Sequence, residues 1–241
     1  MSEHLPAKTA PQPRRIAAVQ SSYVPWKGYF DLIHSVDEFV LFDDVQYTRR
    51  DWRNRNRIKT REGLTWLTIP VAAKGKYLEP IKSIMVSDPG WRERHWRLIR
   101  SSYARSPGFA EYEELFRRLY LDSDEQRLSA INAAFIRDVC RILGITTKIT
   151  WSMDYTLESG RNERLISLCR QTGATTYLSG PRARAYLDIE MFKASGIEVS
   201  FFDYTGYPEY PQPFPPFDHH VSIIDLLFSV GSRAPQFMLS F

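Results

Sequence analysis

A dense cluster of basic side chains lies between residues 49 and 61, where DWRNRNRIKT follows two arginines and precedes a third. It holds seven basic residues and one acid, interleaved with Trp52 and two asparagines. Successive side chains of an extended segment point to opposite faces, so a row of cations lies opposite an edge of amides and aromatics. Guanidinium groups bind phosphate oxygens, and asparagine can both donate to and accept from a base or a sugar hydroxyl. The pattern predicts the wall of a phosphate- and sugar-binding cleft, with a solvated basic strand as the alternative. The expected binding residues are Asn54, Arg55, Asn56, Arg57 and Lys59.

Polar and aromatic side chains follow the short apolar run IAAVQ at 16–20, which is typical of a buried strand. A doubly wound sheet binds its ligands beyond the carboxyl end of such a strand, at the amino end of the following helix. Pro25 suits the first turn of that helix and leaves backbone N–H groups free. We expect this loop to line the site, although hydrophobic packing of its aromatic rings is the alternative. The residues expected to contact substrate are Gln20, Tyr23, Trp26 and Tyr29.

Two carboxylates and one imidazole are candidates for moving a proton. Asp43 and Asp44 follow the second expected strand and could hold a ribose, a substrate amine or Mg²⁺, or pair with the nearby arginines; Gln46 beside them is a further candidate contact. No His or Glu stands at metal-ligand spacing, so no metal site is predicted. His95 lies one turn after Trp91 on an expected helix, as either a structural histidine or an acid–base group. Asp44 and His95 are the expected catalytic residues.

A second turn from strand to helix is expected in SGPRARAYLD at 179–188. Gly180 permits a tight turn and Pro181 starts a helix, so that Arg182 or Arg184 could reach an anion at the positive end of that helix. Two such turns on one parallel sheet can face each other across a single cleft. Gly180 and Arg184 therefore complete the expected substrate-binding set.

Hydrophobic periodicity predicts the elements that must position these residues. The expected strands lie at 16–20, 39–42, 65–71, 81–86, 146–151, 175–180 and 197–202, with helices near 25–36, at 163–171 and up to Ala194. Strand, helix and strand alternate at both ends of the chain, which is the unit of a parallel sheet covered on both faces. The fold class expected is α/β, a doubly wound, mostly parallel Rossmann-like sheet with a helical insert at about 90–143.

Two further segments have distinct patterns. Ser123 and Gln126 form an expected capping box before an amphipathic stripe that stops at Gly144. The Pro-rich C-terminal segment YTGYPEYPQPFPPFDHH at 204–220 cannot form regular structure, because its prolines remove backbone donors. A short helix follows, which His219 and His220 are expected only to cap.

Composition bounds the protein class. The 241 residues are 43% hydrophobic and 25% charged, as in a globular protein with a substantial core. We expect residues 1–14 to be a disordered leader and 15–241 to form one α/β domain. No apolar run approaches the roughly 18 residues that span a bilayer, and the N-terminus lacks the apolar centre of a signal peptide. No membrane insertion is therefore expected, and the expected location is the cytoplasm.

Cysteine usage and charge narrow the chemistry further. Cys140 and Cys169 lie in helical patterns and are expected to be buried reduced thiols, not a disulfide, a metal site or a nucleophile. The net charge of +4 is small, and the basic excess gathers at 49–61. A local anionic partner is therefore favoured over nucleic acid. No motif in the sequence identifies a cofactor.

Several of these blocks occur together in one family. AVQSSYVPWKGYFDLIHSVDEFVLFDDVQYTRRDWRNRNRIKT, WLTIPV, YLSGPRARAYL and SIIDLLFSVG resemble the WbqC-like family, often found among genes for bacterial surface polysaccharides such as O-antigen. The resemblance runs from about residue 15 to 232. The chain departs from the family pattern at Arg182, where a second glycine is expected, and at Ser21 and Ser22, where Pro and Asn are frequent. The resemblance implies a setting of sugars or nucleotide-sugars.

A weaker resemblance concerns the first loop. YVPWKGYFDLI is similar to the strand-loop-helix of nucleotidylyltransferases, which carries a T/H-x-G-H motif. Trp26 and Tyr29 replace the two positions whose hydroxyl or imidazole would contact a triphosphate. Ordinary adenylyl transfer is therefore not expected, although a nucleotide could still lie in the same crevice.

These observations favour an enzyme that binds a nucleotide-linked sugar, or a related phosphorylated or carrier-bound substrate. It would transfer a small acyl or aminoacyl group in envelope polysaccharide or specialised metabolite biosynthesis. No nucleophile is apparent, so the expected mechanism is direct attack by a substrate amine, with the protein supplying proximity and electrostatics. The expected partners are a phosphorylated small molecule and an acyl or peptidyl carrier protein. The alternatives are a non-catalytic scaffold that binds a nucleotide-sugar or a carrier protein, and a nucleic-acid binder that stacks bases on Trp52.

Overall fold

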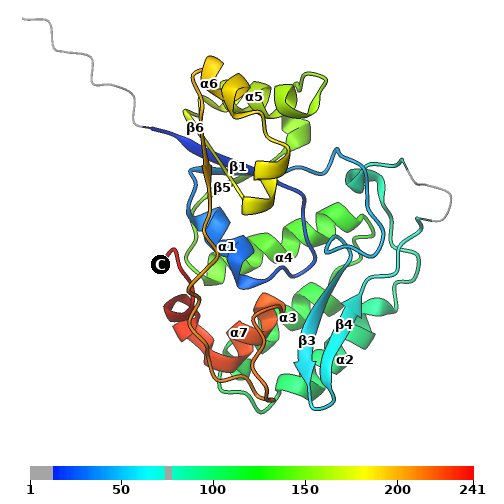
Figure 1. Cartoon of the computed structure of the whole chain (residues 1–241). Coiled ribbons are helices and arrows are strands. Elements are labelled where there is room, and N and C mark those ends of the chain that lie inside the picture. The colour runs from blue at the N-terminus through cyan, green and yellow to red at the C-terminus, as the bar shows by residue number, and fades with distance from the viewer. Residues whose placement is uncertain (1–12, 74–77) are drawn as a thin grey trace, which may run out of the picture.

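A five-stranded parallel sheet forms the centre of the computed structural model, which describes residues 13–73 and 78–241 (Figure 1). Most of the expected leader lies outside the described residues. The strand order is β5-β2-β1-β6-β7, which is the doubly wound α/β arrangement predicted from the sequence. The strands are β1 (Arg15–Val19), β2 (Glu38–Leu41), β5 (Lys148–Trp151), β6 (Thr176–Ser179) and β7 (Glu198–Phe201).

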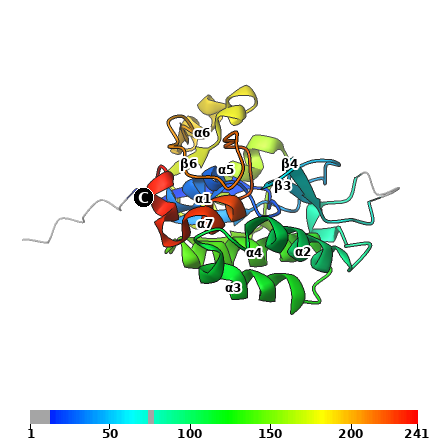
Figure 2. The ribbon, with the colours of Figure 1, turned by 90° about the horizontal axis from the view of Figure 1, so that it is seen from below.

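Helices cover both faces of this sheet (Figure 2). α1 (Lys27–His34) and α4 (Leu128–Ile142) lie on one face, and α5 (Arg161–Thr172) and α6 (Ile189–Ala194) lie on the other. The alternation of strand side chains divides the core accordingly, because Phe39 belongs to the first apolar cluster and its neighbour Val40 to the second. Burial on both faces explains the apolar runs of the central strands, Ile16–Val19 in β1 and Phe39–Leu41 in β2, whereas the edge strands β5 and β7 are more polar and partly exposed.

The long connection between β2 and β5 contains a hairpin and three helices. β3 (Arg55–Thr60) pairs antiparallel with β4 (Gly63–Thr68), apart from the main sheet. α2 (Trp91–Tyr103) and α3 (Phe109–Leu121) lie beside α7 (Ile223–Val230), which also contacts β3. The expected helical segment at 90–143 thus comprises α2 to α4, and α4 itself is the crossover helix that covers the sheet.

Two local expectations were wrong. Residues 81–86 form no strand: Ile81–Ser83 is a 3-10 turn, η1, in which Ile81 N donates to Val45 O at 3.0 Å and Lys82 N to Asp43 O at 2.9 Å. Met85 and Val86 form only isolated bridges, with Arg127 and Val71. The capping box is also absent at the start of α4, whose N-cap is Arg127 without a side-chain hydrogen bond. The carboxylate of Glu125 instead accepts from the N–H of Arg127 at 2.9 Å.

α4 ends at the expected glycine. Gly144 has φ +73°, and the N–H of Ile145 donates to Cys140 O at 2.9 Å, which satisfies a carbonyl of the last turn. We expect Gly144→Ala to lower the free energy of unfolding by about 1 kcal/mol, because an L-residue is strained at this φ. A Cβ at this position would meet nothing within 4 Å, so no steric clash adds to the backbone strain. Urea denaturation measures the loss. Gly144→Asn is the control and should lose less, since asparagine tolerates the left-handed region; an alanine variant as stable as the wild type would contradict the expectation.

The Pro-rich segment forms no helix or strand between residues 202 and 222, as predicted. Buried polar contacts hold it against α1 and α7: Tyr207 OH donates to Asp31 Oδ2 at 2.5 Å, and Tyr210 OH donates to Asp225 Oδ1 at 2.7 Å. Both carboxylates are fully buried. The segment is therefore fixed in place although it lacks secondary structure.

Both cysteines are free and buried, which confirms the expectation of reduced thiols. Burial raises the pKa of each thiol to about 12. Within the described ranges, no helix has the length and apolar character required to cross a bilayer, and no group of three or more His, Cys, Asp or Glu side chains could hold a metal ion.

Candidate functional site

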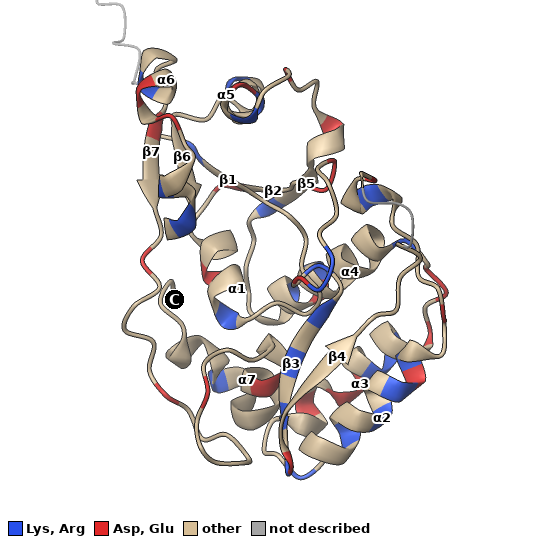
Figure 3. Cartoon of the chain, turned by 45° about the vertical axis from the view of Figure 1, so that its right-hand side comes forward, with Lys and Arg blue, Asp and Glu red and all other residues tan. Residues whose placement is uncertain are grey.

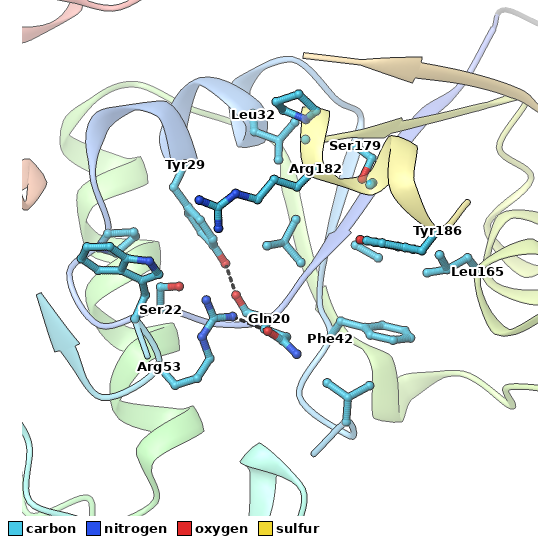
Figure 4. A pocket seen from close by; sticks show the side chains of 18 of the residues that line it. Gln20, Ser22, Tyr29, Leu32, Phe42, Arg53, Leu165, Ser179, Arg182 and Tyr186 are labelled. Carbon is cyan, nitrogen blue, oxygen red and sulfur yellow. Dashed lines mark hydrogen bonds between the residues drawn. The ribbon is translucent and has the colours of Figure 1, made fainter. Parts of the chain in front are cut away.

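A cavity of about 790 Å³ lies beyond the carboxyl ends of β1 and β6 (Figure 4). The chain passes from β1 to β2 on one side of β1 and later returns to β6 on the other, so the switch point of the sheet lies between β1 and β6. Doubly wound proteins bind their ligands at this point. Gln20 directly follows β1 and Gly180 directly follows β6, and both line the cavity. The two turns expected to face one cleft therefore do so.

The charged side chains on the cavity wall are all basic. Among the described lining residues there is no Asp or Glu, whereas four arginines are present together with His220. Arg164 is the one lining arginine that forms an ion pair with a described carboxylate, that of Asp44 outside this cavity. The wall therefore favours an anionic ligand. The lining arginines are Arg53, Arg161, Arg164 and Arg182.

Arg53 is the most buried of these cations, at 8% exposed. Its Nη1 donates to Gln20 Oε1 at 2.7 Å, while its buried Nε has no hydrogen-bond partner among the described atoms. Tyr29 OH donates to the backbone oxygen of Gln20 at 3.1 Å, so these three residues meet at one side of the cavity (Figure 4). A buried guanidinium without a carboxylate partner is costly, and an anionic ligand would offset that cost.

Aromatic rings supply much of the remaining wall. Trp26 and Tyr204 both line the cavity, with ring centroids 5.2 Å apart. The indole of Trp26 lies against the start of α1, where a Cβ on Gly28 would stand 2.4 Å from the ring, so only glycine fits there. Tyr29, Phe42, Trp52 and Tyr186 also line the cavity. Such surfaces suit a base or an apolar group of a ligand.

The amides of the basic stretch bind backbone. Asn56 Nδ2 donates to Tyr23 O at 3.2 Å and to Val24 O at 2.9 Å, and Asn54 Nδ2 donates to Ile69 O at 2.8 Å. Both side chains therefore fix loops around the cavity. Asn56 lines the cavity and Asn54 does not.

The cations of β3 lie outside the cavity. The guanidinium carbons of Arg55 and Arg57 stand 4.2 and 5.5 Å from the ring centroid of Trp66, on the hairpin. Lys59 Nζ donates to the backbone oxygen of Pro216. The alternation expected for this strand is present, but its cationic face does not border the cavity.

Tyr23 and His95 form a buried pair that does not line the cavity. Tyr23 OH lies 2.9 Å from His95 Nδ1 and 2.7 Å from the hydroxyl of Tyr120. Tyr23 is fully buried and His95 is 7% exposed. Burial lowers the pKa of His95 to about 4, so its imidazole is neutral at neutral pH. The arrangement is that of a structural histidine inside an aromatic cluster.

Asp43 and Asp44 have different roles. Asp43 is fully buried and accepts hydrogen bonds from Ser21 N at 2.8 Å and from Ser129 Oγ, which joins the loops after β1 and β2 to the start of α4. Asp44 accepts from Ser152 Oγ at 2.7 Å and forms an ion pair with Arg164 of α5, not with the nearby arginines weighed from the sequence.

The other expected residues are placed as follows. Gln46 is exposed and forms an isolated bridge with Pro80. Gly180 has φ −76°, which any residue adopts, so the backbone at this turn does not require glycine. The guanidinium carbon of Arg184 lies 4.0 Å from the ring centroid of Phe201, whereas Arg182 lines the cavity.

Several lining residues were missed from the sequence. Arg161 and Arg164 come from α5, and Tyr204 and His220 come from opposite ends of the Pro-rich segment. His220 Nδ1 lies 3.2 Å from Asp218 Oδ1, and it does not cap α7, whose N-cap is Ser222. No periodicity marks any of these four positions, because their proximity arises only from the tertiary fold.

A second cavity, of about 560 Å³, adjoins the first and shares Gly160 and Arg164 with it. It lies beyond β2 and β5 and has both signs of charge on its wall, with Asp44 and Glu158 opposed by Lys82 and Arg164. The Asp44–Arg164 ion pair therefore stands between an arginine-rich cavity and a mixed polar one.

Comparisons with known proteins confirm the resemblance. The model of the WbqC-like protein family matches residues 20–237. The chain is also similar to the uncharacterized protein Rv1507c of Mycobacterium tuberculosis, with 46% identity over 225 residues that cover 93% of this chain and 97% of that protein. No solved structure gives a significant match.

Proposed function

The chain belongs to the WbqC-like protein family, and we propose that it is an enzyme that binds a nucleotide-linked sugar, or a related phosphorylated or carrier-bound substrate, in the cavity between β1 and β6. The proposed reaction is transfer of a small acyl or aminoacyl group in envelope polysaccharide or specialised metabolite biosynthesis. The observation that carries the proposal is the cavity wall, in which four arginines and no described carboxylate surround a space at the switch point of the sheet.

The proposed ligand follows from the two kinds of surface in the cavity. Arg53, Arg161 and Arg182 would bind phosphate oxygens, since guanidinium groups form charge-assisted and often bidentate hydrogen bonds with phosphate. Trp26 and Tyr204 would contact a base or another planar group. A volume of about 790 Å³ is within the range of small-molecule sites.

The proposed chemistry needs no protein nucleophile. A substrate amine would attack the carbonyl carbon of an acyl- or aminoacyl-thioester directly, and a guanidinium of the cavity wall would stabilise the developing oxyanion. Collapse of this intermediate would form the amide and break the C–S bond, and the proton lost by the amine would pass to the leaving thiolate. Asp44 keeps its proposed acid–base role at the boundary of the two cavities, where Arg164 pairs with it. His220, on the cavity wall beside Asp218, is better placed than the buried His95 to move the proton.

The second candidate is a non-catalytic binder of the same ligand. It is favoured by the contacts of Asp44, whose carboxylate is already neutralised by Arg164 and hydrogen-bonded by Ser152. Incubating the protein with a bound ligand and an acyl- or aminoacyl-thioester distinguishes the two. An increase in ligand mass by the acyl group supports the enzyme, while tight binding without any product supports the binder.

A thermal-shift titration of the full chain tests ligand binding. The ligands are dTDP-, UDP- and GDP-sugars, coenzyme A, phosphopantetheine and ATP, each at two salt concentrations. A ligand at about 100 times its Kd adds roughly 2.7 kcal/mol of stability and clearly raises the midpoint. No shift with any ligand of this panel would contradict the proposal.

Arg182 offers a matched pair of variants. Arg182→Ala should weaken binding of a diphosphate ligand roughly fivefold to tenfold, because it removes one exposed charge-assisted contact from the wall. Arg184→Ala should bind as the wild type does, since its guanidinium lies over Phe201 and not in the cavity. Isothermal titration calorimetry measures both affinities. An equal loss in the two variants would show that bulk charge, and not the cavity wall, governs binding.

A further inference from the structure

We propose that the solvent-facing side of the β3–β4 hairpin is a docking surface for an acidic protein partner. This surface, termed the hairpin face, comprises Trp52, Arg55, Arg57, Leu64 and Trp66. Arg57 is paired with Trp66 across the two strands, and Leu64 lies two residues before Trp66 on the same side of β4. The proposal goes beyond the proposed function, because the hairpin face uses Arg55 and Arg57, which do not line the cavity.

Large apolar side chains are exposed on the hairpin face. Trp52, Leu64 and Trp66 are 40%, 40% and 42% exposed, while the opposite side of the hairpin is buried through Ile58 and Leu67. The rings of Trp52 and Trp66 lie 5.6 Å apart between centroids. A contiguous exposed group of this kind, bordered by polar side chains, is typical of an interaction site.

The guanidinium groups of the hairpin face are held in place by these rings. The guanidinium of Arg55 lies over Trp66, 4.2 Å from the ring centroid, and that of Arg57 lies beside both tryptophans, 5.5 Å from the centroid of Trp66 and 6.0 Å from that of Trp52. The Nε atoms of both arginines are buried. Two otherwise flexible side chains are thus ordered before any partner binds, which reduces the entropy lost on binding.

The basic side chains of this region form no ion pairs within the described part of the chain. None of the seven basic residues between 49 and 61 forms an ion pair with a carboxylate of the described residues. By contrast, Arg94, Arg117 and Arg127 each pair with a nearby acid. Figure 3 shows the basic residues along β3 and in the loop before it. A partner with excess negative charge is complementary to this region.

The chemistry of the hairpin face favours a protein over a nucleic acid. Nucleic-acid bases stack on free aromatic faces, whereas a guanidinium already lies over Trp66. Tryptophan and arginine together are the residues most enriched at the centres of protein interfaces. The net charge of +4 is also small for a nucleic-acid binder.

The position of the hairpin face relates it to the cavity. Trp52 contacts Trp66 on the hairpin face and also lines the cavity between β1 and β6. A protein docked on the hairpin face would therefore stand at the edge of the cavity. A group carried on the surface of that partner could enter the cavity beside Trp52.

Fluorescence anisotropy with the full chain tests the proposal. The probe is a labelled amphipathic 20-residue peptide rich in Glu and Leu, with a Gln-for-Glu peptide as the neutral reference and labelled oligo-dT of 20 nucleotides as the competing class. The acidic peptide should bind with a Kd that rises steeply with salt, and the neutral peptide should not bind. Arg55→Glu/Arg57→Glu should weaken peptide binding at least tenfold.

A charge-matched control separates the hairpin face from general electrostatics. Arg118→Glu/Lys193→Glu changes two exposed cations on α3 and α6, so both double variants move the net charge from +4 to zero. The control should bind the acidic peptide within twofold of the wild type. Trp66→Ala, which retains the arginines, should weaken binding of the acidic peptide about threefold. This variant tests the proposal if the charge-reversed hairpin does not fold.

Three results would overturn the proposal. One is an equal loss of peptide binding in the two double variants, and another is no binding of the acidic peptide at low salt. The third is oligo-dT bound at least tenfold more tightly than the peptide through Arg55 and Arg57, which would assign the hairpin face to nucleic acid. Binding of a diphosphate ligand should be unchanged in Arg55→Glu/Arg57→Glu, so this test is independent of the cavity.

Discussion

Arg53→Met is expected to weaken binding of a diphosphate ligand about 100-fold while leaving the folded protein as stable as the wild type. Two hydrogen bonds from a guanidinium to a charged oxygen contribute roughly 3 kcal/mol, which corresponds to about two powers of ten in Kd. Arg53 is buried, and no carboxylate lines the cavity with it, so the unliganded protein gains little from its charge. The hydrogen bond to Gln20 is lost, but Gln20 is partly exposed to the cavity and can bind water instead.

Calorimetry and urea denaturation measure these two quantities separately. Arg53→Lys is an informative companion, since it keeps the charge but not the planar fork, and should lose about tenfold in affinity. Arg97→Met removes an exposed arginine from α2 and should change neither quantity. If Arg53→Met unfolded the protein readily yet bound the diphosphate as tightly as before, Arg53 would be a structural residue and the assignment of the anion site would be wrong.

Stability is expected to fall by roughly 2 to 3 kcal/mol between pH 7.5 and pH 4.5 through His95 alone. In the unfolded chain this imidazole takes up a proton near its ordinary pKa of about 6.5. In the folded protein, burial lowers its pKa to about 4. Between these two pKa values the unfolded state binds more protons than the folded state. The contribution of His95 to the free energy of unfolding is therefore fully present above pH 6.5 and is lost as the pH falls toward 4.

The measurement is the free energy of unfolding at several pH values for the wild type and His95→Gln. The variant is less stable at pH 7.5, because it disturbs the contact with Tyr23, but the difference between the two proteins should shrink as the pH falls. Taking the difference removes the contributions of the carboxylates that both proteins share. A difference that stayed constant from pH 7.5 to 4.5 would show that His95 is not held neutral, and would restore it as an acid–base candidate.

The sequence predicted the sheet and the position of the cavity, because both depend on local patterns. Apolar runs identify strands that are buried on both faces, and alternation of strand and helix implies a parallel sheet. The loops after β1 and β6 then meet at the switch point without further information. Gln20, Trp26 and Tyr29 were found in this way, and all three line the cavity.

The choice among the arginines could not be made from the sequence. Alternation separates the two faces of β3 but does not say which of them borders the cavity. The buried face carries Asn56 and Ile58, while Arg55 and Arg57 lie over Trp66 on the exposed face. Arg53 precedes the strand, where the turn directs it into the cavity. That direction is a property of the tertiary fold.

The prediction of a strand at residues 81–86 was wrong for a related reason. Their apolar alternation suits a strand, but Ile81 and Lys82 bind the loop after β2, and Met85 and Val86 form only isolated bridges with Arg127 and Val71. The hydrophobic pattern of a segment predicts which of its side chains are buried. It does not predict which residues its backbone forms hydrogen bonds with.

The placement of the Pro-rich segment has a consequence for synthesis of the protein. Both ends of the segment supply cavity wall, at Tyr204 and His220, and the sheet itself is incomplete until Arg15 in β1 meets Thr176 in β6. A nascent chain on the ribosome therefore lacks the complete binding site until His220 has been translated. Premature termination anywhere before His220 yields a product without a complete cavity, so ligand can stabilise only chains that reach this residue.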